Sequence, residues 1–202
     1  MPDTGAPHFI PFLDGTELVR AYPDFSEDLA DAVADGLSAA GNAGIGSNVV
    51  QTVKTNTFST SNATFTAVTG LSATITPTSA TNKVLVIASY AIGYGTGNGR
   101  QGGSRIVRGA TPVYVGDTEG NRAGGLDNLR WSDAFANLTD RQMLRFTAVF
   151  VDSPETTAAT TYALEVRAES SGIIYINRTA NDGNAVAVSR GASSIVLIEV
   201  DA

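Results

Sequence analysis

Residues 63–92, ATFTAVTGLSATITPTSATNKVLVIASYAI, decide the fold class of this chain. Their first part alternates small or apolar residues with threonine and serine on both sides of Thr69-Gly70, a pattern that predicts a β-hairpin. The second part, Lys83 to Ile92, is a continuous apolar run rich in β-branched residues, which predicts a strand buried on both faces. We therefore expect this run to form a central strand of a sheet.

The two-residue period continues from residue 49 to the end of the chain, and no helical period recurs there. Residues 144–150 place their apolar side chains on one parity, and residues 162–169 alternate apolar with mostly charged side chains. Further strands are predicted at Val49–Phe58, Arg105–Val107, Pro112–Val115, Ile173–Asn177, Ala185–Ser189 and Ser194–Val200. Many short strands joined by Gly, Asn, Asp and Thr turns predict an all-β domain over residues 49–202, either a sandwich or a closed barrel.

The first 48 residues have a different character. Residues 1–24 are proline-rich and predict an extended arm. Asp24 with Glu27 forms a capping box and Gly41 is a terminator, so we expect one short α-helix at 25–41, followed by a joint at 42–48. Apolar side chains of the arm and helix are expected to anchor the chain to a larger particle or to other copies of itself. They are Phe9, Phe12, Leu29, Val33 and Leu37.

The composition excludes several classes of protein. Hydrophobic residues make up 43% of the 202 residues, which excludes wholesale disorder. No apolar run reaches the ~18 residues of a membrane span and the N-terminus lacks signal-peptide features, so we expect a soluble, unprocessed chain. The net charge of −7 opposes binding to nucleic acid. The chain has no Cys and a single His, His8, so we expect no disulfides, thiolate chemistry, His-dependent catalysis or cofactor.

A glycine motif follows the central apolar run. Gly97, Gly99 and Gly102 match GxGxxG, the dinucleotide-binding pattern, which requires a helix to begin at that point. Because SRIVRG continues instead as a strand, we interpret residues 95–103 as a glycine-rich surface loop.

A second long loop, residues 116–133, carries most of the polar side chains that could recognise a ligand. Its only Trp could form an aromatic platform for a sugar ring with two tyrosines, while acidic and basic loop residues bind the hydroxyl groups. The alternative is that this Trp caps the core. The candidate receptor-binding residues are Tyr94, Tyr114, Asp117, Arg122 and Trp131.

Acidic residues of the same loop permit two other hypotheses. Asp117 with Glu119, or Asp127 with Asp133, could act as the acid and base of a glycoside hydrolase, but no motif fixes either pair close together. A calcium site would need DxDxDG-like spacing, which the loop lacks, so no metal is predicted.

The last predicted strand, SSIVLIEV at 193–200, is strongly apolar, and an exposed edge there would invite aggregation. A domain with few charges and no disulfides fits an assembly in which neighbouring copies bury apolar surface. We therefore expect a homo-oligomer.

Three segments frame the β-domain: VVQTVKTNTFSTSNATFTAVTGLSATITPTSATNKVLVIAS at 49–89, RIVRGATPVYVGDTEGNR at 105–122, and SRGASSIVLIEV at 189–200. Together they resemble the C-terminal β-domain of structural proteins of tailed bacteriophages, of the tail-fibre, minor tail and head-fibre type. The resemblance implies a jelly-roll-like antiparallel sandwich, often trimeric, at the exposed end of a virion protein. Residues 1–45 also resemble phage adaptor segments, and the absence of a long shaft implies a short spike or decoration.

Three functions follow from these expectations. The first is a non-enzymatic virion protein, made in the bacterial host cytoplasm, that forms a homotrimer, attaches to other virion proteins through its N-terminus and presents loops to a host-surface glycan or protein. The second is a capsid or neck decoration that stabilises the particle and binds no receptor. The third, a glycan depolymerase, ranks last because the β-domain has no His and no paired-carboxylate motif.

Overall fold

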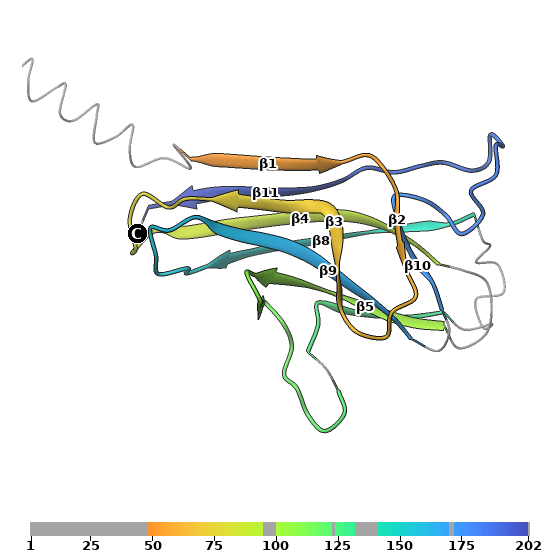
Figure 1. The fold of residues 1–202 in the computed structure, drawn as a ribbon, viewed down its shortest axis with the longest axis horizontal. Helices are drawn as coiled ribbons and strands as arrows, with labels where there is room; N and C mark the ends of the chain where they lie inside the picture. The colour runs from red at the N-terminus through yellow and green to blue at the C-terminus, as the bar shows by residue number, and fades with distance from the viewer. Residues whose placement is uncertain (1–47, 95–99, 123, 132–140, 170–171, 202) are drawn as a thin grey trace, which may run out of the picture. The chain divides into compact units, whose positions relative to one another are not determined.

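The computed structural model describes residues 48–94, 100–122, 124–131, 141–169 and 172–201. The predicted arm, helix and almost all of the joint therefore lie outside the described residues, as do the anchoring side chains of Phe9, Phe12, Leu29, Val33 and Leu37. The described part of the chain belongs to one compact unit, Ile45–Ala202, and consists of β-strands with no helix (Figure 1).

Eleven strands are present in the described residues. They are β1 Val49–Lys54, β2 Phe58–Thr60, β3 Thr66–Ile75, β4 Lys83–Tyr94, β5 Arg100–Arg108, β6 Thr111–Val113, β7 Asp127–Trp131, β8 Met143–Asp152, β9 Thr160–Glu169, β10 Ile174–Ile176 and β11 Ser193–Val200.

The strands form two antiparallel sheets. In the six-stranded sheet, β4 pairs with β8 on one side and with both β11 and β10 on the other, while β1 extends β11 and β2 extends β10. The five-stranded sheet has the order β3-β9-β5. The other edge of β5 pairs with two short strands, one after the other: β7 pairs with its first half and β6 with its end. The prediction that residues 83–92 form a central strand is confirmed, since β4 is paired along both edges.

The core lies between the two sheets, as the alternation along each strand requires. In β4, Val84, Val86 and Ala88 point inward and are at most 1% exposed. From the opposite sheet, alternate residues of β9 such as Leu164 and Val166 fill the same core. The prediction of an all-β fold is confirmed, and the arrangement is a sandwich rather than a closed barrel.

The predicted hairpin turn and one predicted strand are wrong. Thr69-Gly70 does not turn a hairpin, because residues 66–75 form the single strand β3, whose register against β9 shifts between Ala67 and Ser72. Gly70 has a φ of 79°, which places this irregularity in the left-handed region that glycine tolerates. Residues 185–189 form no strand; the Val188 amide instead donates to the Ala185 carbonyl at 2.9 Å, which closes a turn, and Val186 is fully exposed.

A buried glutamate ties the end of the last strand to two other segments. Glu199 is 2% exposed, and one of its carboxylate oxygens accepts hydrogen bonds from the Thr78 amide (2.6 Å), the Thr78 hydroxyl (2.7 Å) and Asn82 Nδ2 (2.7 Å). Asn48 Nδ2 donates to the other oxygen at 3.0 Å. Burial alone would raise the pKa of Glu199, but the donors of Asn82, Thr78 and Asn48 hold it at about 2. The ionised carboxylate therefore joins β11, the β3–β4 connection and the residue before β1.

A buried asparagine fixes the chain after β10. Asn177 is completely buried with a φ of 61°, and its Nδ2 donates to the carbonyls of Lys54 (2.8 Å) and Asn56 (3.1 Å). The hydroxyl of Ser193 donates to Asn177 Oδ1 at 2.6 Å. Asparagine suits this position because it tolerates the left-handed region and its amide both donates and accepts.

Candidate functional site

A groove of about 410 Å³ lies at one open side of the sandwich. In the described residues β8 pairs only with β4, and β6 pairs only with β5, so each strand has a free edge on this side. The groove is lined by side chains of both sheets and of the loop between them. They are Tyr90, Tyr114, Leu126, Asp127, Phe146, Thr147, Ala148 and Val149.

Tyr114 forms the exposed aromatic wall of the groove. It follows β6 directly, lies flat on the ring of Phe150 with centroids 4.7 Å apart and planes 4° apart, and remains 60% exposed. Its φ of 53° is in the left-handed region, where a bulky residue costs about 1–3 kcal/mol. Backbone strain of this kind concentrates at binding sites, because there it holds a side chain in the orientation that the ligand needs.

Asp127 supplies a carboxylate beside this wall. Its Oδ2 accepts hydrogen bonds from the hydroxyls of Ser104 (2.7 Å) and Tyr90 (3.1 Å), and its Oδ1 accepts one from the Ser104 amide (3.0 Å). Burial raises the pKa of Asp127, and the hydrogen bonds from Ser104 and Tyr90 oppose the increase. Burial, followed by the nearby charge of Asp127, also raises the pKa of Tyr90. The carboxylate of Asp127 is therefore held in place at the groove by the buried hydroxyl groups of Ser104 and Tyr90.

This arrangement suits the recognition of a polyhydroxylated ligand. A flat exposed ring offers apolar surface on which the face of a sugar can lie, and a fixed carboxylate accepts hydrogen bonds from hydroxyl groups. Phe146 adds a second, half-buried aromatic ring at the groove, and it packs on Tyr90, which is 1% exposed, with ring centroids 6.0 Å apart. The free edge of β8 also presents backbone amides and carbonyls without strand partners in the described residues.

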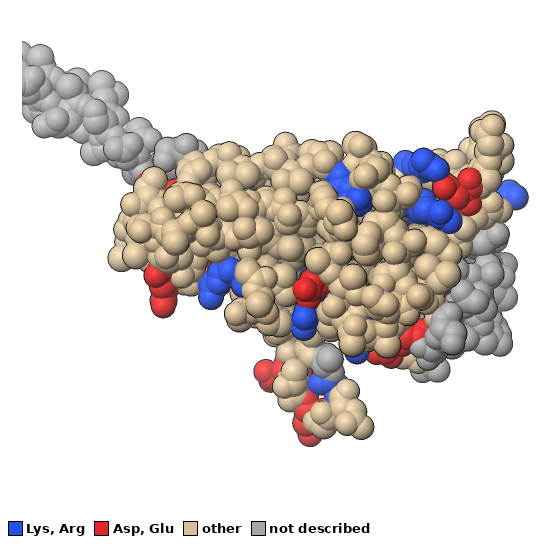
Figure 2. Space-filling view, in the orientation of Figure 1, with Lys and Arg blue, Asp and Glu red and all other residues tan. Residues whose placement is uncertain are grey.

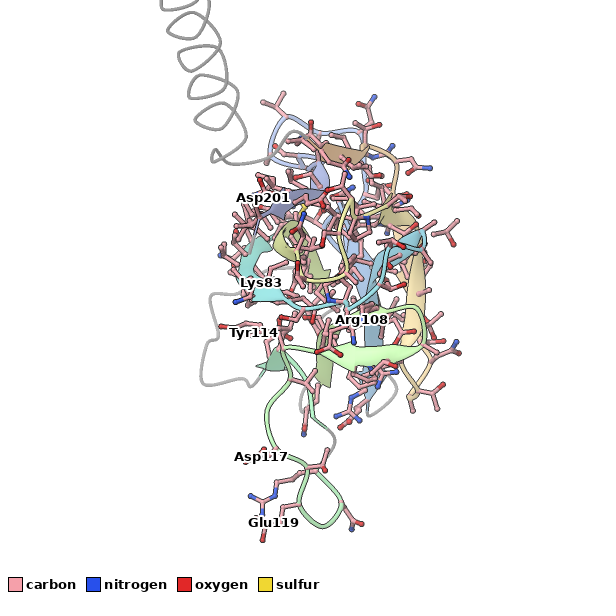
Figure 3. The ribbon with its side chains drawn as sticks, turned by 90° about the vertical axis from the view of Figure 1, so that its left-hand side faces the viewer. Lys83, Arg108, Tyr114, Asp117, Glu119 and Asp201 are labelled. Atoms are coloured by element: carbon pink, nitrogen blue, oxygen red, sulfur yellow. The ribbon has the colours of Figure 1, made fainter. Side chains whose placement is uncertain are left out.

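A protruding loop begins beside the groove. The segment from Tyr114 to Leu126 leaves the body of the domain and returns, and Asp117 and Glu119 lie along its outer part, away from Tyr114 (Figure 3). Near its tip, Arg122 pairs with Glu119 at 3.1 Å, and both side chains are more than three-quarters exposed. Exposed pairs of this kind contribute little stability, and neither Glu119 nor Arg122 lines the groove.

The structure separates the five predicted receptor-binding residues. Tyr114 lies in the groove, and Asp117 and Arg122 lie on the protruding loop next to it. The expectation for Tyr94 is corrected: it is 3% exposed in the core, where an apolar strand segment buries it, so it cannot stack on a ligand from solvent. Trp131 ends β7, opposite Arg100 of β5, so residues 127–131 form a strand and not, as predicted, part of the long loop; the side chain of Trp131 lies outside the described part.

The last glycine of the GxGxxG match has a packing role. Gly102 lies within β5, and a Cβ at this position would meet the Tyr94 hydroxyl and, at 2.5 Å, Cδ1 of Ile174. Gly97 and Gly99 lie outside the described residues. The interpretation of SRIVRG as a strand is confirmed as far as Arg108, but residues 100–103 belong to the same strand β5, so their interpretation as part of a surface loop is wrong.

Most of the groove was not identified from the sequence. In the sequence, Asp127 is recognised only as a possible catalytic partner of Asp133. Ser104, Phe146 and Phe150 are not predicted as site residues. The parity of residues 144–150 correctly indicated that Phe146 and Phe150 share a face. Nothing in that parity shows that β8 ends its sheet, because strand order depends on long-range pairing.

No protein-family model matches the chain, and no curated protein shows significant similarity to it. Among the described residues, no cluster of three or more His, Asp or Glu side chains is arranged to hold a metal ion. Within the same ranges, no helix has the length and apolar character needed to cross a membrane.

Proposed function

We propose that this protein is a non-enzymatic bacteriophage virion protein, a short trimeric fibre or spike whose β-sandwich binds a host-surface receptor. Its N-terminal residues attach it to other virion proteins, and the β-domain faces outward. The observation that carries the receptor role is the groove, where the strained and exposed Tyr114 lies beside the fixed carboxylate of Asp127. A surface glycan is the ligand class that this combination fits best.

We also propose that the domain is a jelly roll, a fold frequent in viral and sugar-binding proteins. Support comes from the strand order. Reading across each sheet gives β1-β11-β4-β8 and β3-β9-β5-β6, so that first and last strands are neighbours and successive strands mostly alternate between sheets. The segments that resemble phage proteins supply both outer and central strands of this arrangement, including β1, β4 and β11.

Binding is favoured over hydrolysis by the number of carboxylates. A glycoside hydrolase generally needs two, about 5–10 Å apart across the scissile bond. Asp127 is the only acidic residue that lines the groove in the described chain. Its carboxylate also accepts three hydrogen bonds, which suits a positioned acceptor better than an acid or nucleophile.

A capsid or neck decoration without a receptor is the second candidate. The apolar outer face of the six-stranded sheet, described below, favours this role because it suits packing between protein subunits. The two functions differ in what they require of the groove, since a decoration has no need of a strained, exposed tyrosine.

The experiment that tests the receptor role measures binding of the full chain to an array of bacterial surface oligosaccharides. Titration calorimetry then follows with the strongest binder. Tyr114→Ala should weaken binding at least tenfold, because the stacking surface is lost. The control is Tyr175→Ala, which removes a tyrosine that lies outside the groove, under the Arg178 guanidinium at 4.5 Å. Equal affinities of wild type and Tyr114→Ala would refute the assignment of the site.

The virion assignment has its own test. The protein should be detected in purified particles by mass spectrometry, and antibodies against the β-domain should label them in electron micrographs. Absence from purified particles would refute the assignment, whatever the oligosaccharide array shows.

A further inference from the structure

The two outer faces of the sandwich differ sharply in chemistry. On the five-stranded sheet, the outward side chains include Arg105 paired with Glu165 at 2.7 Å and Arg167 paired with Glu169 at 2.8 Å. Charged and hydroxyl side chains such as these are what a solvated sheet face carries. The outer face of the six-stranded sheet instead carries aliphatic side chains across all four of its long strands.

The strand register places these aliphatic residues in rows. Leu85 of β4 lies opposite Val151 of β8 and Ile198 of β11, and Ile198 lies opposite Val49 of β1. The next row, two residues further along β4, has Val149, Ile87, Val196 and Gln51 side by side. A third row has Thr147, Ser89, Ser194 and Val53. Eight of these twelve residues are aliphatic, and the other four, Gln51, Ser89, Thr147 and Ser194, are polar and uncharged; the set is here called the aliphatic face.

Several members of this face are exposed to a degree that is unfavourable for aliphatic side chains in water. Val49, Val53, Val149 and Val151 are 53–56% exposed. Lys83 lies in register beyond one end of the face, and Arg145, opposite Ala91 beyond the other end, reaches back to donate a hydrogen bond to Ser89 Oγ of the third row at 3.0 Å. Figure 2 shows charged side chains at both ends of the domain, near its middle and on the protruding loop, in the view in which β3 and β9 of the five-stranded sheet lie nearest the viewer.

The size of the face fits the centre of a subunit interface. Four strands about 4.8 Å apart and three rows about 6.7 Å apart cover about 400 Å². A standard interface buries about 800 Å² on each partner, with an apolar centre that lacks charges and a polar rim. The aliphatic face supplies such a centre, and Lys83, Arg145 and the surrounding hydroxyl groups supply such a rim.

The chemistry of the face also selects its partner. A charged partner surface would lose hydration here without gaining ion pairs, so the partner must be flat, neutral and aliphatic over the same area. Another copy of this chain presents the same flat, neutral and aliphatic surface, and in the proposed trimer this face of each copy would lie toward the threefold axis, against its two neighbours. We propose that another copy of this chain covers the aliphatic face in solution. This inference rests on the oligomeric part of the proposed function, and Thr147 and Val149 belong both to this face and to the lining of the groove.

Native mass spectrometry and sedimentation of the full chain test the inference. The wild type should be an oligomer, and Val49→Glu with Val151→Glu should dissociate it to monomers, because both substitutions put charge into the buried centre. The control is Ser72→Glu, on the exposed outer side of β3, which should leave the assembly unchanged. A monomeric wild type, or a double variant that stays assembled, would overturn the proposal.

A labelling experiment remains decisive if the double variant fails to fold. The chain has no cysteine, so single cysteines can be introduced without background. Val151→Cys should react with a maleimide at least tenfold more slowly than Ser72→Cys, since only Val151 is covered in the assembly. Equal rates in an assembled protein would show that copies meet elsewhere. Tyr114→Ala should leave this protection unchanged, which separates failure of the interface from failure of the receptor site.

Discussion

Replacing Glu199 with glutamine tests how the domain is held together. The carboxylate of Glu199 is buried and accepts four hydrogen bonds, three of them on one oxygen. A glutamine keeps the shape of the side chain but loses the negative charge. Its NH₂ group must also face at least one donor, either Asn48 or the Thr78–Asn82 group.

The pKa of Glu199 gives the size of the expected effect. Its pKa falls from an ordinary 4.5 to about 2 in the folded chain. At about 1.4 kcal/mol for each pH unit, the ionised carboxylate contributes on the order of 3 kcal/mol. Because the folded pKa is the lower one, this stability is fully present above pH 4.5 and is lost as the pH falls toward 2. Glu199→Gln should lose about 3 kcal/mol at pH 7 and much less near pH 2.

Urea unfolding at a fixed protein concentration, repeated from pH 7 to pH 2, measures this difference. The fixed concentration matters because assembly also adds to apparent stability. The control is Glu119→Gln, whose side chain is 81% exposed and whose ion pair with Arg122 should contribute less than about 1 kcal/mol. A Glu199→Gln variant as stable as wild type at pH 7, or one that loses stability with acid as steeply as wild type, would refute the reasoning.

Three further predictions concern other buried positions. Asn177→Ala should lower the free energy of unfolding by about 2–4 kcal/mol, because the carbonyls of Lys54 and Asn56 lose their donor and alanine disfavours the left-handed φ. Urea unfolding measures this loss, and a value below about 1 kcal/mol would contradict the prediction. Gly102→Ala should lower the free energy of unfolding by about 1–3 kcal/mol, since the new Cβ would meet Cδ1 of Ile174 at 2.5 Å and the Arg167 carbonyl oxygen at 2.6 Å. A thermal unfolding midpoint equal to that of the wild type would argue against this packing. Burial raises the pKa of Asp127. The contribution of Asp127 to stability is therefore most favourable below its ordinary pKa of 3.8, and it declines as the pH rises through the raised pKa of the folded chain. Asp127→Asn should therefore remove a decline in stability with rising pH, and parallel pH profiles for variant and wild type would contradict the shift.

The sequence predicted the fold class because alternation reports local geometry directly. The apolar run at 83–92 was correctly interpreted as a central strand, since only a strand with partners on both sides tolerates so few polar residues. The same rule failed at Thr69-Gly70, where a glycine that would suit a turn instead accommodates an irregularity inside β3. It also failed at 185–189, where alternation occurs without an adjacent strand.

The candidate site was predicted less well, because it depends on which strands end each sheet. Tyr114 was selected as an exposed aromatic residue near a polar loop, and it lies in the groove. Tyr94 was selected by the same reasoning and lies in the core, since its position at the end of β4 buries it between the sheets. Asp127 could not be distinguished from other acidic loop residues. Its burial depends on contacts with Ser104 and Tyr90, which are 23 and 37 positions away.

The most direct test of the receptor role is hydrogen–deuterium exchange of the full chain with and without the oligosaccharide that the array selects. We predict that bound ligand slows exchange in residues 113–116, 125–127 and 144–149, the segments that form the groove, and leaves β1 and β11 unchanged. Protection confined to other segments, or none at a saturating oligosaccharide concentration, would contradict the account.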